Sequence, residues 1–243
     1  MSEFVNNTAL NYLQTLGSNS VDLILTDPPY AISRDTNFQS GEPTGKDTDR
    51  FRVSYNFGDW DVVDIPYFKE VFKEAYRVLR KGGTCIVWYD IWKIQELREI
   101  LEPLGFRMFR TIEWIKTNPV PINSGVNYLS NAKEMAIVCV KGSKPTFNAS
   151  YHKGVFEYPI YQGADRFHPT QKHLTLFCDL INIHTNEGDV VLDFFSGSAT
   201  TQVAALLTGR EYLGCEADVN IFNQAEERLN EYTEQQNHPE GTD

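Results

Sequence analysis

The sequence has few of the features that indicate a membrane protein, a disulfide-bonded protein or a metal site. It contains no uninterrupted apolar run close to the roughly 20 residues of a membrane span. Residues 1–10 lack the basic start and the apolar stretch of a secretory leader. The four cysteines stand far apart, with no C-x-x-C pair. We therefore expect a cytoplasmic protein without membrane contact, with reduced and mostly buried thiols and without a metal site.

Basic residues are also in short supply. The 243 residues include 22 Lys and Arg against 33 Asp and Glu, a formal net charge of −11. This balance disfavours nucleic acid as a partner, because phosphate binding depends on Lys and Arg. The charge is uneven, however, since residues 107–175 hold nine basic and four acidic residues, and residues 211–243 hold one and nine. The middle of the chain remains a candidate anion-binding surface, although ordinary solvated surface would give the same pattern.

What the chain does have is the composition of an ordered α/β protein. Its residues are 41% hydrophobic and 13% aromatic, which argues against disorder. Apolar runs predict strands at residues 21–26, 84–89, 106–115, 134–140, 190–193 and 212–215. Helical spacing predicts helices from Pro66 to the Gly82–Gly83 pair and at residues 91–104, 170–184, 199–208 and 219–234. This alternation predicts an open, mainly parallel sheet covered on both faces, with ligands beyond the carboxyl ends of the strands.

Asp27, Pro28, Pro29 and Tyr30 follow the first of these strands. The two prolines fix the backbone and remove two N–H donors. The Asp27 carboxylate and the Pro28 carbonyl can accept the two hydrogens of an NH₂ group, and the Tyr30 ring can stack on the planar group that carries it. The tetrapeptide therefore suits a nucleobase, although a rigid turn with a capping Asp would look the same.

A second loop follows the strand at residues 190–193. Strand, small-residue turn and helix form an arrangement in which backbone approaches a cofactor closely. The loop matches neither G-x-G-x-x-G nor a phosphate-binding loop. Glu216 ends the strand at residues 212–215 and could accept both hydroxyls of a ribose. An adenosine-bearing cofactor that needs no phosphate site fits this pattern best.

With both loops in this order, the chain resembles the S-adenosylmethionine-dependent amino-methyltransferases of DNA, in their circularly permuted beta class. The D-P-P-Y loop of that family corresponds to residues 27–30 and its cofactor loop, usually D-P-F-x-G-S-G-T-T, to residues 193–201. Its H-P-T-Q-K segment corresponds to residues 168–172, and residues 79–83, residues 113–119 and Glu134 match further landmarks. The resemblance covers about residues 7–232. It implies a Rossmann-like methyltransferase fold with the catalytic half first and the cofactor half last.

The resemblance also implies a reaction and its residues. Asp27, Pro28, Pro29 and Tyr30 would hold a flipped adenine of a short DNA sequence while its N6 receives the methyl group of S-adenosylmethionine. An Asp in the first position is typical of adenine N6 methylation, and a Ser is typical of cytosine N4. Thr170 and Lys172 are expected at the carboxylate of the cofactor. The whole cofactor set is His168, Thr170, Gln171, Lys172, Asp193, Phe195, Ser196, Gly197, Ser198, Ala199, Thr200 and Glu216.

Three departures from the family pattern concern the cofactor. Ala199 replaces the usual third glycine, so this position either avoids a positive φ or approaches the cofactor less closely. Phe194 replaces the usual proline, and Asn7 or Thr8 stands where relatives commonly have an acid. These departures leave open a catalytically weak protein that binds S-adenosylmethionine and DNA. The base-binding loop would accept any planar NH₂ group, so a cytosine-N4 DNA methyltransferase and an RNA adenine methyltransferase also stay open.

We expect residues 1–243 to form a single catalytic domain in which two irregular segments serve DNA recognition. Residues 118–167 are expected to form a small target-recognition segment, and residues 31–58 a mobile loop. Expected partners are duplex or single-stranded DNA, a cognate restriction endonuclease and a second copy of the chain, in a bacterial or phage setting. The candidate DNA contacts are Arg34, Arg50, Arg52, Lys116, Asn118, Lys133, Lys141, Lys144, Lys153 and Arg166.

Overall fold

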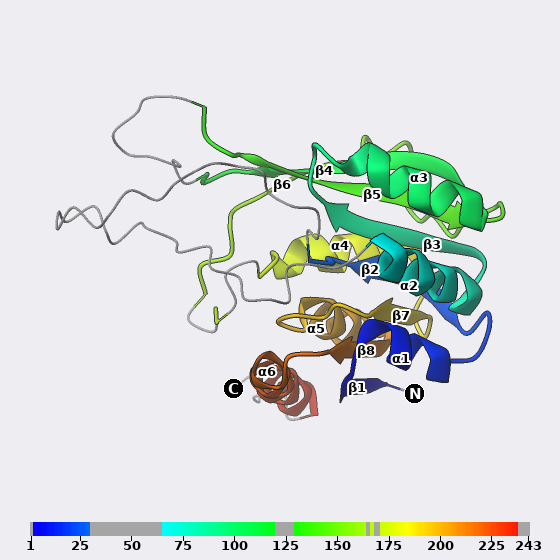
Figure 1. Cartoon of the computed structure of the whole chain (residues 1–243). Helices are drawn as coiled ribbons and strands as arrows, with labels where there is room; N and C mark the ends of the chain where they lie inside the picture. The colour runs from blue at the N-terminus through cyan, green and yellow to red at the C-terminus, as the bar shows by residue number, and fades with distance from the viewer. Residues whose placement is uncertain (1, 30–64, 120–128, 164–165, 168–170, 238–243) are drawn as a thin grey trace, which may run out of the picture.

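A computed structural model describes residues 2–29, 65–119, 129–163, 166–167 and 171–237. An eight-stranded sheet with the order β1-β8-β7-β2-β3-β5-β4-β6 forms its centre (Figure 1). The strands are β1 (Glu3–Asn6), β2 (Val21–Thr26), β3 (Leu79–Tyr89), β4 (Phe106–Lys116), β5 (Lys133–Lys141), β6 (Val155–Tyr158), β7 (Val190–Asp193) and β8 (Glu211–Glu216). The helices are α1 (Ala9–Thr15), α2 (Ile65–Val78), α3 (Ile94–Leu104), α4 (Leu174–His184), α5 (Thr200–Leu207) and α6 (Val219–Asn237).

The sheet is mainly parallel, as the sequence predicts. Strands β1, β8, β7, β2 and β3 pair in parallel, and β6 is parallel to β4. Only β5 is reversed among the described strands, because it pairs antiparallel with both β3 and β4. The start of β5 therefore lies beside the end of β3, where Met135 is opposite Tyr89. We call the edge at which β2, β3, β7 and β8 end the carboxyl edge.

Helices cover both faces of the sheet (Figure 1). On one face, α1, α2 and α3 bury apolar residues such as Leu13, Phe72 and Leu101 in one core cluster. On the other face, α4 and α5 contribute to a second cluster that contains Phe177 and Ala204. Two separate cores on the two faces of one sheet are the doubly covered arrangement that strand–helix alternation predicts.

The glycine pair after α2 is where our expectation was wrong. The helix ends at Val78, and β3 begins at the next residue and contains Gly82 and Gly83. A Cβ on Gly83 would lie 2.9 Å from the carbonyl oxygen of Asp22, and Gly82 has a φ of +83°. The glycines therefore let β3 pass close to β2 through a register shift.

The short elements β1, α1 and β6 were not expected from the sequence. Helix α4 begins at Leu174, later than the expected residue 170. The other helices and strands lie within a few residues of their expected bounds. Cys85, Cys139 and Cys215 are buried free thiols, and Cys178 is partly buried and free. No helix among the described residues is long and apolar enough to span a membrane.

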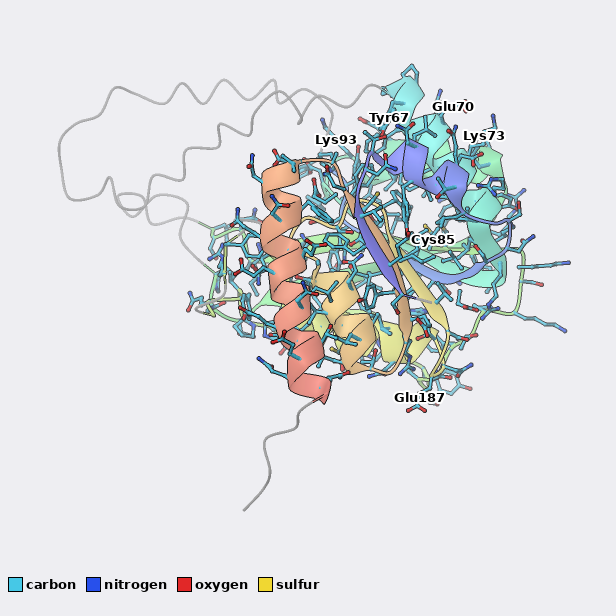
Figure 2. All side chains as sticks on the ribbon, turned by 90° about the horizontal axis from the view of Figure 1, so that it is seen from below. Tyr67, Glu70, Lys73, Cys85, Lys93 and Glu187 are labelled. Carbon is cyan, nitrogen blue, oxygen red and sulfur yellow. The ribbon has the colours of Figure 1, made fainter. Side chains whose placement is uncertain are left out.

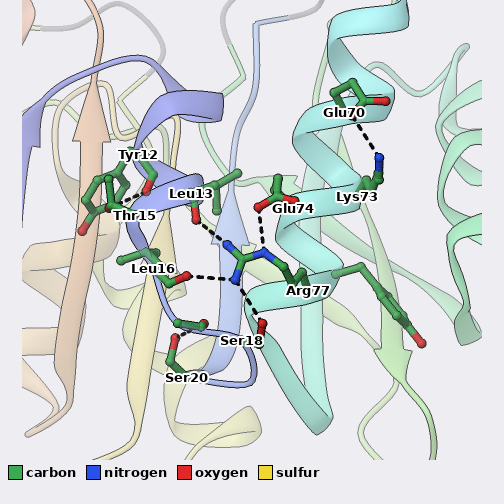
Figure 3. Close-up of polar contacts among 12 residues, drawn as sticks. Tyr12, Leu13, Thr15, Leu16, Ser18, Ser20, Glu70, Lys73, Glu74 and Arg77 are labelled. Atoms are coloured by element: carbon green, nitrogen blue, oxygen red, sulfur yellow. Dashed lines mark hydrogen bonds and ion pairs between the residues drawn. The ribbon is translucent and has the colours of Figure 1, made fainter.

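Arg77 of α2 fixes the segment that leads into β2 (Figure 3). Its guanidinium donates hydrogen bonds to the carbonyl oxygens of Leu13 at 2.8 Å and Leu16 at 2.9 Å, near the end of α1. It also donates to the Ser18 hydroxyl and pairs with Glu74. Carbonyl groups at a helix end lack partners within the helix, so this cation stabilises the turn before β2.

The two ends of the molecule are separated by the length of the strands. Figure 2 shows Tyr67 and Lys93 at one end, Glu187 at the other and Cys85 between them. Lys93 follows the end of β3, and Glu187 precedes the start of β7. The end with Tyr67 and Lys93 is therefore the carboxyl edge, where ligands of such sheets bind.

Candidate active site

The two loops identified from sequence lie next to each other at the carboxyl edge. Strands β2 and β7 are neighbours, with Ile24 opposite Leu192. Beyond this pair, the Thr26 hydroxyl donates a 2.6 Å hydrogen bond to Asp193 Oδ1. The last residue of β2 is thus bonded to the last residue of β7. The end of β2, which Asp27 follows, and the loop expected to hold the cofactor are therefore fixed relative to each other.

Asp193 is the centre of this connection. It is 3% exposed, and its carboxylate also accepts hydrogen bonds from the Thr201 hydroxyl at 2.7 Å and the Phe195 N–H at 3.1 Å. Burial raises the pKa of Asp193 to about 6, and the three hydrogen bonds oppose this rise. Since these bonds engage both carboxylate oxygens within the protein, Asp193 braces the two loops.

The turn after β7 is tightly held. Ala199 lies in the left-handed region, with φ 57° and ψ 29°, and is completely buried. The expected alternative in which this position avoids a positive φ is therefore wrong, and the left-handed conformation carries strain for a residue with a Cβ. Arg228 of α6, itself 3% exposed, donates a 2.8 Å hydrogen bond to the carbonyl oxygen of Ser198. This buried hydrogen bond helps to hold the turn in that conformation.

Glu216 ends β8 beside this turn. Its carboxylate accepts the N–H of Gly197 and the N–H of Asp218, each at 2.9 Å. Burial raises the pKa of Glu216, and hydrogen bonds from backbone N–H groups oppose the rise. Asn7, at or next to the position where relatives commonly have an acid, donates its N–H to the carbonyl oxygen of Glu216. Glu216 is thus held by the loop expected to bind the cofactor, as a ribose-binding carboxylate would need to be.

Other residues of the expected cofactor set fit a ligand with polar and apolar parts. Phe195 is partly buried and stacks on Phe68 of α2, with ring centroids 6.1 Å apart. Gln171 is 4% exposed, and its side-chain oxygen and nitrogen have no hydrogen-bond partner among the described residues. A buried amide in that state is suited to receive a polar group. Ser198 and Thr200 hydroxyls are buried and 3.1 Å apart. His168 and Thr170 lie outside the described residues.

The catalytic loop begins where β2 ends. Pro28 is buried, Asp27 and Pro29 are partly buried, and Tyr30 lies outside the described residues. Asp27 Oδ2 is 2.9 Å from the ammonium group of Lys172. The same ammonium is 2.6 Å from Glu134 Oε2, and Glu134 Oε1 is 2.7 Å from Lys116 Nζ. We call Asp27, Lys172, Glu134 and Lys116 the ion-pair network.

The network was not expected from the sequence. Lys172 was placed at the cofactor carboxylate, Lys116 at DNA and Glu134 only at the start of a strand. Burial alone would raise the pKa of Glu134, but the ammonium groups of Lys172 and Lys116 outweigh it and lower the pKa to about 2. Glu134 is therefore ionised at neutral pH. The only sequence signal was the match of Glu134 and Lys172 to family landmarks.

The candidate DNA contacts separate into three groups. Lys141 donates to the carbonyl oxygens of Tyr76 and Leu79 at the end of α2, and Lys144, with a φ of 61°, packs its backbone against Gly82. Both lie at the edge opposite Asp27, since Val140 pairs with Thr84 at the start of the Thr84–Tyr89 part of β3. Lys141 and Lys144 therefore lie away from the edge that carries Asp27, and their expected contact with DNA phosphates stays a prediction.

In the second group, Lys116, Asn118 and Lys133 lie near the carboxyl edge. Lys116 belongs to the ion-pair network, and Asn118 accepts the N–H of Ile160 at 2.5 Å, which braces the chain after β4. Lys133 is 3.5 Å from Glu113 and has a 55% exposed side chain. Lys153 and Arg166 are exposed, and Lys153 lines a pocket together with Thr84 and Val140, towards the opposite edge. The third group, Arg34, Arg50 and Arg52, lies outside the described residues together with the expected mobile loop at residues 31–58.

Comparisons with known proteins agree with this geometry. A family model named for N6 and N4 methyltransferases, described as DNA methylase, matches residues 21–227. The chain belongs to this DNA methylase family. Among known relatives, the type II methyltransferase M.HinfI of Haemophilus influenzae is 29% identical over 256 aligned positions, which cover 95% of this chain and 69% of the relative. The type II methyltransferase M2.DpnII of Streptococcus pneumoniae is 29% identical over 245 positions, covering 93% and 88%.

Solved structures of DNA methylases have the same fold. This chain superposes on the crystal structure of an M1.HpyAVI–SAM complex with a TM-score of 0.70 at 28% identity, covering 95% of this chain and 100% of that one. The cytosine-N4-specific PvuII DNA methyltransferase has a TM-score of 0.71 at 17% identity, covering 96% and 92%. The expected Rossmann-like methyltransferase fold is confirmed. The circular permutation stays a prediction. Among the described residues of this methylase, no group of three or more His, Cys, Asp or Glu could hold a metal ion.

Proposed function

We propose that this DNA methylase transfers a methyl group from S-adenosylmethionine to N6 of an adenine in a short DNA sequence. One observation carries the proposal. Asp27, the first residue of the D-P-P-Y loop, lies beside the loop after β7, and the Thr26–Asp193 hydrogen bond fixes the two together. A nucleobase receptor and a cofactor loop at one sheet edge are what a direct transfer between two bound molecules needs.

The described residues fit S-adenosylmethionine. Glu216 is held by Gly197 and can accept ribose hydroxyls, and Phe195 and Gln171 offer an apolar face and a buried amide. When bound, the cofactor supplies an electrophilic methyl group on a sulfonium. M1.HpyAVI, with the same fold, was crystallised in complex with this molecule.

The chain's own part in the reaction is positioning and hydrogen bonding. The exocyclic nitrogen of adenine is conjugated with its ring and is a poor nucleophile. Asp27 and the Pro28 carbonyl can accept its two hydrogens and so draw the lone pair out of conjugation. Tyr30 would stack on the base once it has left the duplex. The proton released afterwards passes to Asp27 or through it to water.

For DNA recognition, we propose residues 118–167 as the target-reading segment, with Lys133, Lys153 and Arg166 near phosphates. Residues 31–58 are proposed to close over the flipped base. We further propose a cytoplasmic, bacterial or phage-encoded protein that works with a cognate restriction endonuclease, in keeping with the type II names of the relatives, and that pairs as a homodimer.

Sequencing of DNA from cells that express the protein tests this function. We expect methylated adenines at one short sequence with the wild type and none with Asp27→Ala, because the variant lacks an acceptor for the amino group. Glu70→Ala, which changes an exposed acid of α2, is the matched control and should methylate as the wild type does. Methylated cytosines in place of adenines would show the N4 alternative, and no methylation would contradict the proposal.

A further inference from the structure

The ion-pair network connects Asp27 to three segments far from it in sequence. Lys172 bridges Asp27 and Glu134 with N···O distances of 2.9 and 2.6 Å, and Lys116 holds the other oxygen of Glu134 at 2.7 Å. Asp27 follows β2, Lys116 ends β4, Glu134 is the second residue of β5, and Lys172 precedes α4. Charges alternate along the network and sum to zero.

The two lysines of the network are largely shielded from water. The side chains of Lys172 and Lys116 are 7% and 13% exposed, and those of Asp27 and Glu134 are 19% and 25% exposed. The ammonium group of Lys172 lies 5.5 Å from the ring of Trp88, and that of Lys116 lies 5.5 Å from the ring of Trp114. These two rings contact each other edge to face. Ion pairs that are partly removed from water are screened little by salt and hold their geometry better than surface pairs.

We propose that Lys172 is a positioning residue for the Asp27 carboxylate, and that Glu134 and Lys116 hold Lys172 in place. The inference rests on the proposed function, because it concerns the carboxylate that receives the amino group. An ion pair on Oδ2 restricts rotation of the carboxylate, and misplacement by about 1 Å lowers a rate by roughly 100-fold. Lys172 thereby acts on the base-binding side of the site, in place of the expected contact with the cofactor carboxylate.

The pairing also bears on what Asp27 does in the reaction. A neighbouring ammonium favours the ionised form of a carboxylate. Asp27 is then kept as a hydrogen-bond acceptor for the amino group while the carbon–nitrogen bond forms, and the proton leaves the nitrogen after it has become cationic. Glu134 pairs with the same ammonium group, and this second ion pair holds Lys172 beside Asp27.

The experiment compares variants in a methyl-transfer assay with genomic DNA that lacks methylated adenine. Lys172→Met should lower kcat by about 100-fold and leave the Kd for S-adenosylmethionine unchanged. Lys172→Arg keeps a cation that can bridge two carboxylates and should recover part of the loss. Lys73→Met removes an exposed lysine of α2 that pairs with Glu70, and should behave as the wild type.

A purely structural role is separated from positioning by the variant Lys116→Met. It also removes one of the two ammonium groups beside Glu134, but it leaves Lys172 paired with Asp27. We expect Lys116→Met and Lys172→Met both to unfold at a lower urea concentration than the wild type, and Lys172→Met to have the much lower kcat. An equal loss of kcat in the two variants would overturn the proposal.

Two further outcomes separate a failure of this inference from a failure of the proposed function. If Lys172→Met weakened binding of S-adenosylmethionine and kept kcat, Lys172 would contact the cofactor and the positioning role would be wrong, while the proposed function would stand. If the wild type transferred no methyl group to DNA, the proposed function and this inference would both fail. Wild-type turnover therefore tests the function, and the ratio of variant to wild type tests the network.

Discussion

Replacing Asp193 by asparagine should stabilise the protein at neutral pH but not at acidic pH. Burial raises the pKa of Asp193 to about 6, against an ordinary value of 3.8. Below the ordinary value, the carboxyl is protonated in both the folded and unfolded states and has no effect. As the pH rises through this window, the unfolded state loses its proton first, so the free energy of unfolding falls with increasing pH.

The magnitude follows from the shift. A difference of about two pKa units corresponds to about 3 kcal/mol at pH 7, of which about 2 kcal/mol develops between pH 4.5 and 7. Asparagine can keep the local bonds: its oxygen can accept from Thr26 and Phe195, and its amide can donate to the Thr201 hydroxyl, which already lies 3.2 Å from the Leu25 carbonyl oxygen. The introduced amide would thus mimic the protonated acid at every pH.

The assay is urea unfolding of both proteins at pH 4.5, 5.5 and 7, and the quantity compared is the difference between them. The wild-type profile alone is not informative, because burial lowers the pKa of His184 to about 4 and so decreases stability as the pH falls over the same range. Glu226→Gln, an acid-to-amide change at an exposed position of α6, is the matched control. A pH-independent difference for Asp193→Asn would show that the Asp193 carboxyl does not destabilise the folded protein at neutral pH.

Three further predictions concern stability. Arg77→Met should lower the free energy of unfolding by about 2–3 kcal/mol in urea unfolding, because the cation serves two carbonyl groups near the end of α1; an unchanged value would contradict this role. Ala199→Gly should raise the melting temperature slightly. Glycine removes the strain of a left-handed alanine, about 1–2 kcal/mol, and this gain exceeds the cost of a more flexible unfolded chain, about 0.4–1 kcal/mol. A lower melting temperature would show that packing of the Ala199 methyl group contributes more than this strain. Lys141→Met should lower the free energy of unfolding by about 1–2 kcal/mol, because the lysine ammonium is bonded to the carbonyl oxygens of Tyr76 and Leu79. DNA binding in a gel-shift titration should not weaken, because these carbonyl groups lie at the edge opposite Asp27. Weaker DNA binding at unchanged stability would show that Lys141 contacts DNA.

The sequence was most informative where a strand is buried on both faces. Strands β2 and β7 have the bounds that their apolar runs predict, Val21–Thr26 and Val190–Asp193. Each run ends in an acid-containing loop, so the two loops could be expected at the same edge of a parallel sheet. The strands β1 and β6 are as short as β7, but they lie at the two edges of the sheet and lack its continuous apolar run, so the sequence does not identify them.

The ion-pair network depends on strand direction, which local sequence does not reveal. Because β5 is antiparallel to β4, Glu134 lies opposite Trp114, near Lys116 at the end of β4. The same reversal puts Lys133 at the carboxyl edge and Lys141 at the opposite edge. A parallel β5 would have exchanged these two positions and moved Glu134 away from Lys116.

The most direct test of the central claim identifies the methylated nucleoside. Purified protein is incubated with S-adenosylmethionine labelled in its methyl group and with unmethylated DNA, and the DNA is digested to nucleosides and separated. We predict that the label is found in N6-methyldeoxyadenosine, and that Asp27→Ala yields none. Label in N4-methyldeoxycytidine would contradict the assignment of adenine, and DNA without label would contradict the account as a whole.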